Sequence, residues 1–166
     1  MPVQLLQPCD AKLVDALAVE TGFELNTQDE LARGFARLWV ARVGPDSIEP
    51  DGFLLAWIAA DELHIIAIGT RPTQRRRGLG RQLVLTLIEF ARSNHSRLLI
   101  LEVRRSNMAA IALYRSFGFS VSRLRRGYYA NPTEDGIEMQ LVLDEQGDIV
   151  TSVDEVPCLE VLECPT

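Results

Sequence analysis

The strongest structural signal in this sequence is one long amphipathic helix between two short apolar segments. Its apolar side chains recur at helical spacing and mark one face: Leu79, Leu83, Val84, Leu87, Ile88 and Ala91. Residues 63–69 before it and residues 98–103 after it are apolar and short, as expected of buried strands. A helix face of this kind needs an apolar partner, so the sequence predicts a sheet with a helix packed on it.

Two short helices are expected before the first strand. Asp10 can cap a helix whose apolar positions are Leu13, Val14, Leu17 and Ala18. Thr27 and Glu30 have the spacing of a capping box, which predicts a second helix starting at Thr27.

The remaining elements follow from alternation and turn residues. An antiparallel meander is expected over residues 38–43, 53–59 and 63–69, a helix over 108–117 ended by Gly118, and closing strands over 119–124 and 137–143. The order α-α-β-β-β-α-β-α-β-β predicts an α/β (α+β) fold. Its central sheet is mixed and mostly antiparallel, with about six to seven strands and helices on both faces.

Composition places these elements in one domain, expected over residues 1–143, followed by an acidic tail. Residues 144–166 carry seven acidic side chains and no Lys or Arg, so partial disorder is expected there. The apolar runs fall far short of the ~20 residues that cross a bilayer, and residues 1–5 lack a basic signal region. A cytoplasmic protein without membrane contact is expected. Cys9, Cys158 and Cys164 lack zinc-site spacing, so we expect reduced thiols and no metal.

An arginine- and glycine-rich loop, residues 75–81, connects the third meander strand to the long helix. Unpaired amides at a helix N-terminus, together with the helix dipole, attract a diphosphate, and Gly78 and Gly80 allow its close approach. A dinucleotide-binding loop is an alternative, but the third glycine is missing and an antiparallel meander precedes the loop. A nucleic-acid patch is another, with weak support because no aromatics are interleaved.

Glu102 stands near the end of the apolar 98–103 segment. By strand alternation it continues the face of Leu98 and Ile100, which would place its carboxylate at the edge of the core. Burial there would raise its pKa and favour a general base that works near neutral pH. The alternative is a salt bridge to a neighbouring arginine.

Asn107 and Tyr114 are seven residues apart, almost two helical turns, so one ligand could contact both. A phenol on this face could protonate a departing thiolate. Alternatively, Tyr114 is a core aromatic beside Phe117 and Phe119. His64 could tune the site or be a structural residue of its strand.

Together these motifs resemble the GNAT superfamily of N-acetyltransferases. Arg75-x-x-Gly78-x-Gly80 resembles the family's coenzyme signature. Segments that resemble the bacterial ribosomal-protein alanine N-acetyltransferases are Leu101-Glu102-Val103-Arg104 through Asn107 and Tyr114 to Phe119, Arg125-Arg126-x-Tyr128-Tyr129, and Trp57-x-x-x-Asp61-Glu62-x-His64. The resemblance covers roughly residues 37–143. Thr70, Gln74 and the missing Pro-Trp pair near residue 25 depart from the pattern, and the acidic tail has no counterpart.

The resemblance implies a GNAT fold, acetyl-coenzyme A as co-substrate and no metal. The pyrophosphate would face the amides of Arg76, Arg77, Gly78, Leu79, Gly80 and Arg81. The strand through Ile68, Gly69 and Thr70 would bind the pantetheine arm and thioester carbonyl, and Asn107 would contact the coenzyme. Glu102 would be the base and Tyr114 the acid.

The implied acceptor is the N-terminal alanine of a small-subunit ribosomal protein, without direct nucleic-acid contact. Tyr128 and Tyr129 would wall the peptide slot, or else pack as strand residues. Two alternatives stay open: a GNAT enzyme acting on a small amine or a lysine side chain, and a non-catalytic module that binds acetyl-coenzyme A.

Overall fold

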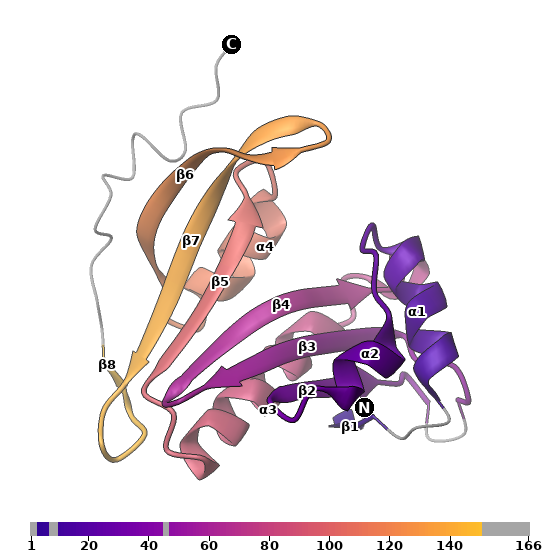
Figure 1. Ribbon diagram of the computed structural model, residues 1–166, viewed down its shortest axis with the longest axis horizontal. Coiled ribbons are helices and arrows are strands. Elements are labelled where there is room, and N and C mark those ends of the chain that lie inside the picture. Colours follow the sequence, from indigo (N-terminus) through magenta and orange to yellow (C-terminus); the bar gives the residue numbers. More distant parts are fainter. Residues whose placement is uncertain (1–2, 7–9, 45–46, 151–166) are drawn as a thin grey trace.

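The computed structural model describes residues 3–6, 10–44 and 47–150 (Figure 1). Its elements, in chain order, are β1 (Val3–Leu5), α1 (Ala11–Glu20), α2 (Thr27–Ala32), β2 (Ala36–Ala41), β3 (Gly52–Ala59), β4 (Glu62–Thr70), the 3-10 turn η2 (Pro72–Gln74), α3 (Leu79–Ser93), β5 (Leu98–Arg104), α4 (Met108–Arg115), β6 (Ser120–Ala130), β7 (Thr133–Leu143) and β8 (Ile149–Val150). The three cysteines and residues 151–166 of the expected acidic tail lie outside the described residues.

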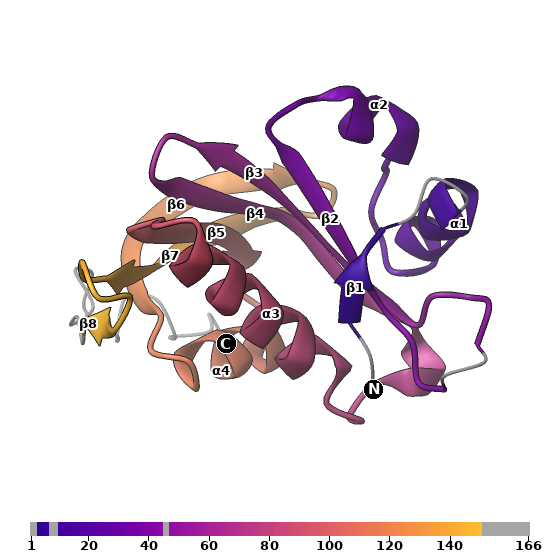
Figure 2. The same ribbon diagram turned by 90° about the horizontal axis from the view of Figure 1, so that it is seen from below.

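The predicted order of helices and strands is confirmed, with the short strands β1 and β8 in addition. They bring the sheet to eight strands in the order β1-β2-β3-β4-β5-β7-β6, with β8 paired to β7. The pairing of β4 with β5 is parallel and the other pairings are antiparallel, so the sheet is mixed and mostly antiparallel as expected. Helices α1 and α2 cover one face, and α3 and α4 the other (Figure 2).

The long helix packs as its periodicity predicts. All six apolar positions of its predicted face are buried in α3. They join the larger core, which fills the face of the sheet under α3 and α4 and includes Leu63, Leu99, Leu101, Val103, Ile137 and Met139. A smaller cluster under α1 contains Val14, Leu17, Leu38, Val40 and Phe53. Within the described ranges, no helix is long and apolar enough to span a membrane.

Both predicted N-terminal caps are corrected by the structure. Asp10 stands at the N-cap of α1, but its side chain makes no capping hydrogen bond and instead pairs with Arg42 at 2.9 Å. Helix α2 is capped one residue earlier than expected, by Asn26, whose side chain accepts from the amide of Asp29. Glu30 accepts instead from the indole of Trp57 of β3 at 2.8 Å, because the fold brings this long-range partner within reach.

The sheet opens between its two central strands. β4 and β5 pair only from Glu62–Leu98 to Ile65–Leu101, and no later pair between them occurs in the described chain. Just after this point, the β3–β4 register skips Ile66, which indicates a β-bulge. Beyond the bulge, the strands diverge toward their C-terminal ends (Figure 1). The sheet therefore carries two unpaired edges that face each other where the functional residues were predicted.

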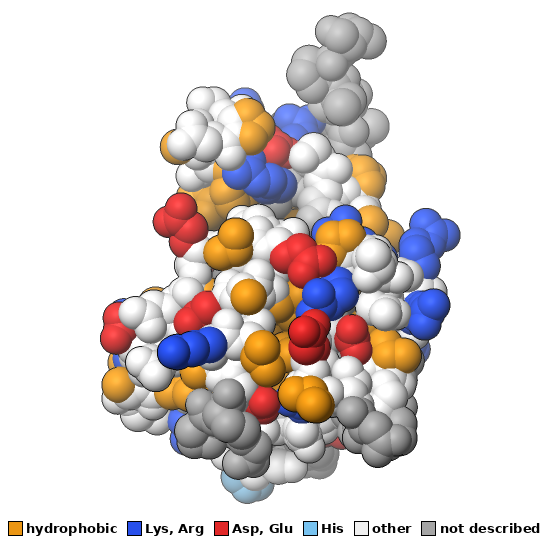
Figure 3. Space-filling model, turned by 90° about the vertical axis from the view of Figure 1, so that its right-hand side faces the viewer, with side chains coloured by type: hydrophobic (Ala, Val, Ile, Leu, Met, Phe, Trp, Pro, Cys, Tyr) orange, Lys and Arg blue, Asp and Glu red, His pale blue; other side chains and the backbone are white. Residues whose placement is uncertain are grey.

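An ion-pair cluster holds the end of β4 in place. Arg71 pairs with Glu20 of α1 at 3.1 Å, with Glu49 at 3.2 Å and with Asp51 at 3.7 Å. Acidic and basic side chains are interspersed over the face of the molecule that α1 forms (Figure 3). Because Arg71 immediately precedes η2, these pairs fix the point where the arginine-rich loop leaves the sheet.

Candidate active site

The loop before α3 presents a row of free backbone amides. Arg76 and Gly78 have left-handed backbones, with φ of 64° and 84°, and Gly78 is the N-cap of α3. The first helical hydrogen bond runs from the Gln82 amide to the Gly78 carbonyl. Among the described residues, no backbone acceptor is assigned to the amides of residues 76–81. Left-handed residues at a helix N-terminus form an anion-binding concavity, and its positive dipole end adds to the attraction.

Gly69 of β4 and Gly80 at the start of α3 lie close to neighbouring elements. A Cβ built on Gly69 would lie 2.5 Å from Thr21 Oγ1 and 2.6 Å from Phe53 Cε1, so a side chain does not fit at this position. A Cβ on Gly80 would lie 3.4 Å from Leu113 of α4, at ordinary contact distance. Ile68, Gly69 and Thr70 therefore run along the open edge of β4 with the glycine packed against α1.

Glu102 is the first residue of β5 beyond its pairing with β4. Leu99, Leu101 and Val103 are buried toward α3 and α4, while Leu98, Ile100 and Glu102 alternate onto the other face. The predicted alternation is confirmed, but the predicted burial is wrong, because this face is only half-covered and the Glu102 side chain is 29% exposed. The alternative expectation for Glu102, a salt bridge to an arginine, is confirmed, because Arg125 Nη1 lies 2.6 Å from Glu102 Oε1.

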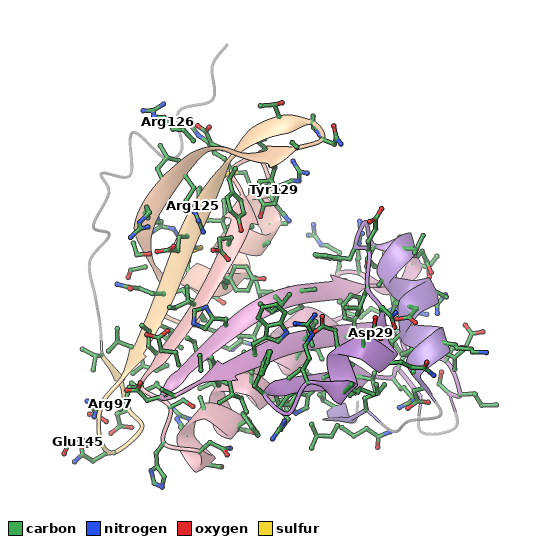
Figure 4. All side chains as sticks on the ribbon, viewed as in Figure 1. Asp29, Arg97, Arg125, Arg126, Tyr129 and Glu145 are labelled. Carbon is green, nitrogen blue, oxygen red and sulfur yellow. The ribbon has the colours of Figure 1, made fainter. Side chains whose placement is uncertain are left out.

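The hairpin of β6 and β7 is longer than predicted and brings its aromatic residues to the site. It extends to Ala130 and Thr133, so both predicted wall residues belong to β6. The Tyr128 ring lies under the Arg125 guanidinium at 4.4 Å, and the Tyr129 ring under that of Arg104 at 4.2 Å. The two rings meet edge to face at 5.0 Å. Tyr129 lies on the face of the hairpin that carries Arg125, while Arg126 points away from the sheet (Figure 4).

Asn107 and Tyr114 lie at opposite ends of α4 in different surroundings. Asn107 is the N-cap, outside the helix proper, and its side chain accepts from the Ala110 amide at 3.2 Å. The helical spacing argument therefore does not apply to it, although it still lies at the exposed start of α4 near β5. Tyr114 is buried among the core residues under α3 and α4, and its ring contacts that of Phe119.

Burial is the main cause of the pKa shifts of Tyr114 and Tyr129. It raises the pKa of Tyr114 well above its ordinary value, and neighbouring Tyr129 raises it further. Burial also raises the pKa of Tyr129 to about 12, with a smaller contribution from Tyr128 and an opposing one from Arg104. Both phenols are therefore protonated at neutral pH and can act as proton donors.

Glu102 and Tyr114 lie on opposite faces of β5. Tyr114 packs with Leu101 and Val103, whereas Glu102 belongs to the alternate set of side chains. The open edge between β4 and β5 connects the two faces. Glu102 and Tyr114 therefore lie on the two sides of the strand that borders this opening.

A pocket of about 340 Å³ lies at the end of β3 and the start of β4. Its lining includes Phe35, Trp57 and His64, and Trp57 pairs with His64 across β3 and β4. His64 Nε2 lies 2.8 Å from Glu62, so the histidine has a structural partner. The pocket offers apolar surface beside the half-covered face of the sheet.

Glu134 of β7 braces the hairpin against the loop between β5 and α4. Its carboxylate accepts from the Ser106 amide at 2.6 Å and pairs with Arg104 at 3.2 Å. Hydrogen bonds from the Ser106 side chain and amide hold the pKa of Glu134 below its usual value of 4.5, and Arg104 adds to this effect. A lowered folded-state pKa stabilises the fold above 4.5, and this contribution disappears as the pH falls through the folded-state value.

We therefore expect Glu134→Gln to lower the melting temperature at pH 7 by about 2–4 °C. The difference from wild type should shrink as the pH falls below 4.5 and should vanish once Glu134 is protonated in the folded state as well. Thermal unfolding followed by circular dichroism from pH 7 to pH 3 measures this. Glu24→Gln is the control, because Glu24 is exposed. A pH-independent difference would show that the carboxylate charge is not what braces the hairpin.

Two side chains at the site received no role from sequence alone. Arg125 is predicted only as part of a motif, and the sequence pattern gives Glu138 no role. Glu138 lies directly opposite Glu102 in the β5–β7 pairing and 4.0 Å from Arg125. Detecting either residue requires the register of three strands, and the only signal in the sequence is a charged side chain at each corresponding position. The described residues contain no group of three or more potential metal-ligating side chains.

Comparison with known proteins agrees with this geometry. Residues 10–119 match the profile described as the Acetyltransferase (GNAT) family. The chain is 42% identical over 91 residues to the ribosomal protein bS18-alanine N-acetyltransferase of Escherichia coli K12, which covers 55% of this chain and 60% of that relative. It is 43% identical over 79 residues to the N-alpha-acetyltransferase RimI of Mycobacterium tuberculosis, 48% of each chain.

A solved structure supports the same assignment over a longer range. The crystal structure of the ribosomal-protein-S18-alanine N-acetyltransferase from Escherichia coli superposes with a TM-score of 0.74 and 28% identity. That alignment covers 84% of this chain and 91% of the other. Since the family profile extends over more than half of the sequence, the protein belongs to the Acetyltransferase (GNAT) family.

Proposed function

We propose that the protein is an acetyl-coenzyme A-dependent Nα-acetyltransferase of the cytoplasm that modifies the N-terminal amine of another protein. The proposed acceptor is the N-terminal alanine of a small-subunit ribosomal protein. Support for the acceptor comes from the relatives, since those with 42% and 43% identity are named for alanine or Nα-acetylation. The proposal includes one catalytic domain, residues 1–143, followed by the acidic segment.

The coenzyme is assigned to the loop and to the open edge of β4. Six consecutive amides, from Arg76 to Arg81, suit the pyrophosphate, because the left-handed loop and the α3 dipole favour an anion there. Ile68, Gly69 and Thr70 have backbone groups for the amides of the pantetheine arm, as an added strand would. Asn107, at the facing start of α4, is a further contact.

The proposed reaction uses one proton acceptor and one proton donor. Glu102, directly or through one water, removes a proton from the α-ammonium, and the free amine attacks the thioester carbonyl. An N–H of residues 68–70 stabilises the oxyanion of the tetrahedral intermediate. The C–S bond then breaks and Tyr114 protonates the departing sulfur. The nitrogen releases its second proton to solvent, Tyr114 regains a proton from solvent, and the amide and coenzyme A are released.

The observation that carries this proposal is the divergence of β4 from β5 beside Glu102. Pairing stops at Ile65 and Leu101, one residue before the carboxylate and at the bulge that opens β4. In this proposal, the opening lies between the donor groups of β4 and a strand that carries Glu102 on one face and Tyr114 on the side of the other. A thioester in it would meet all three.

A substrate scan tests the proposal. Peptides beginning with Ala, Ser and Met would be compared with polyamines and with peptides whose only amine is an internal lysine, by coenzyme A release and mass spectrometry. We expect the peptide beginning with Ala to give the highest kcat/KM, with one acetyl group on the α-amine. A strict preference for a polyamine or lysine would support the alternative acceptor, and no release with any amine would support a binding module.

A further inference from the structure

We propose that Arg125 is a resident cation that the substrate ammonium replaces at Glu102, and that Glu138 accepts the displaced guanidinium. This inference rests on the proposed function, because it assigns the α-ammonium to Glu102. It makes Arg125 and Glu138 positioning residues that act on acceptor binding.

The pairing of β5 with β7 brings two carboxylates together. Glu102 and Glu138 are directly opposite each other on neighbouring antiparallel strands. Side chains in such pairs have Cβ atoms about 4.5–5.5 Å apart, and like charges there are destabilising. A cation beside them offsets this repulsion. In the register, β6 places Arg123 opposite Glu138 and Arg125 opposite Gly136, and it is Arg125 whose Nη1 lies 2.6 Å from Glu102 and 4.0 Å from Glu138.

The carboxylates of Glu102 and Glu138 differ in their hydrogen bonds and in their exposure to solvent. Glu138 Oε1 accepts from the Ser122 hydroxyl at 2.8 Å, and its side chain is 18% exposed. Glu102 lies one residue past the end of the β4–β5 pairing, and its side chain is 29% exposed. Glu102 is thus the carboxylate that a ligand can reach, and Glu138 is the one anchored beside it.

The Arg125 side chain is positioned by an aromatic ring of its own strand. Its guanidinium lies over the Tyr128 ring, which packs against the bare Cα of Gly136, where a Cβ would lie 2.9 Å from Tyr128 Cδ1. Tyr128 belongs to a bulge of β6 between Arg125 and Tyr129. Within this bulge, the Gly127 amide donates a hydrogen bond to the Asp135 side chain. A long, flexible side chain over an aromatic face can move by a few ångström between two carboxylates while keeping the ring contact.

The exchange follows from these contacts. Arg125 occupies the Oε1 atom of Glu102 at 2.6 Å, so an ammonium that binds this oxygen must displace the guanidinium. With Glu138 beside it, Arg125 passes to a second carboxylate without losing an ionic partner, which lowers the cost of clearing Glu102. The number of ion pairs at the site is conserved, and the ammonium is left beside the base.

A double-mutant cycle tests the exchange. The KM for an N-terminal-alanine peptide and kcat would be measured for wild type, Glu138→Gln, Arg125→Gln and the double variant. We expect Glu138→Gln to raise KM about three- to tenfold in the wild-type background with kcat within about twofold, since the lost ion-pair exchange acts on binding. In the Arg125→Gln background, the factor by which Glu138→Gln raises KM should be smaller, by about threefold or more, than the factor in the wild-type background. Equal costs of Glu138→Gln in both backgrounds would overturn the exchange.

Guanidinium ion is an independent probe of the vacated position. At millimolar concentration it should inhibit Arg125→Gln competitively against peptide and not against acetyl-coenzyme A, and should inhibit wild type less. Inhibition equal in both proteins would also overturn the proposal. Arg126→Gln, which removes the same charge from an exposed neighbour on β6, is the matched control and should keep the wild-type KM.

Folding and function are separated by the remaining measurements. Melting temperatures and acetyl-coenzyme A titrations of every variant establish that the fold and the donor site are intact. If wild type acetylates no peptide, the proposed function fails and the exchange fails with it. If wild type turns over and the cycle shows no coupling, the exchange alone fails.

Discussion

Glu102→Gln is expected to lower kcat by about 10²- to 10⁴-fold, the range typical of a lost general base. The amide keeps the size of the side chain and can still accept a hydrogen bond from Arg125, but it cannot take a proton from the substrate ammonium. Because Glu102 faces away from α3 and α4, the loop that is assigned to the coenzyme should be unaffected. The affinity for acetyl-coenzyme A should therefore match that of wild type.

Steady-state kinetics with a saturating alanine peptide, together with calorimetric titration of acetyl-coenzyme A, measure both parts of this expectation. Glu89→Gln provides the control, since Glu89 is an exposed carboxylate of α3. A higher pH should recover part of the lost rate, because a fraction of the peptide then arrives as free amine. If kcat of the Gln variant equals that of wild type, Glu102 has no part in proton transfer.

The parts of this fold that sequence predicts well are those set by local periodicity. The apolar face of α3 was identified in full, because its spacing of three and four residues has one physical interpretation. The alternation of β5 was identified for the same reason, and it placed Glu102 on the correct face. The glycine loop was located because left-handed backbone and free amides depend on residue type over a few positions.

What sequence did not predict depends on partners far along the chain. Glu102 pairs with Arg125, 23 residues away, and faces Glu138 only because β7 lies between β5 and β6 in the sheet. Asp10 pairs with Arg42 instead of capping α1, since a long-range ion pair outcompetes a local hydrogen bond there. The face of β5 that carries Glu102 is only half-covered because α1 and α2 pack on β2, β3 and β4, an arrangement that no local sequence pattern predicts (Figure 1).

Tyr114→Phe is expected to lower kcat by a comparable factor, about 10²- to 10⁴-fold, with little change in the fold. The buried ring contacts Phe119 and core residues of β5, and phenylalanine keeps these contacts. Only the hydroxyl is lost, so the variant separates a proton donor from a core aromatic. If Tyr114 serves the core alone, kcat stays within about twofold of wild type.

The raised pKa of Tyr114 adds a second measurement that does not depend on turnover. Above the ordinary tyrosine value of 10.0, the unfolded chain releases this proton while the folded chain retains it. The unfolded state then binds fewer protons than the native state, so the free energy of unfolding falls as the pH rises. Wild type should lose stability between pH 10 and pH 11 more steeply than Tyr114→Phe, measured by urea unfolding at each pH. Parallel curves for the two proteins would show that the Tyr114 phenol is not buried in solution. Another residue would then have to be the proton donor to the departing sulfur.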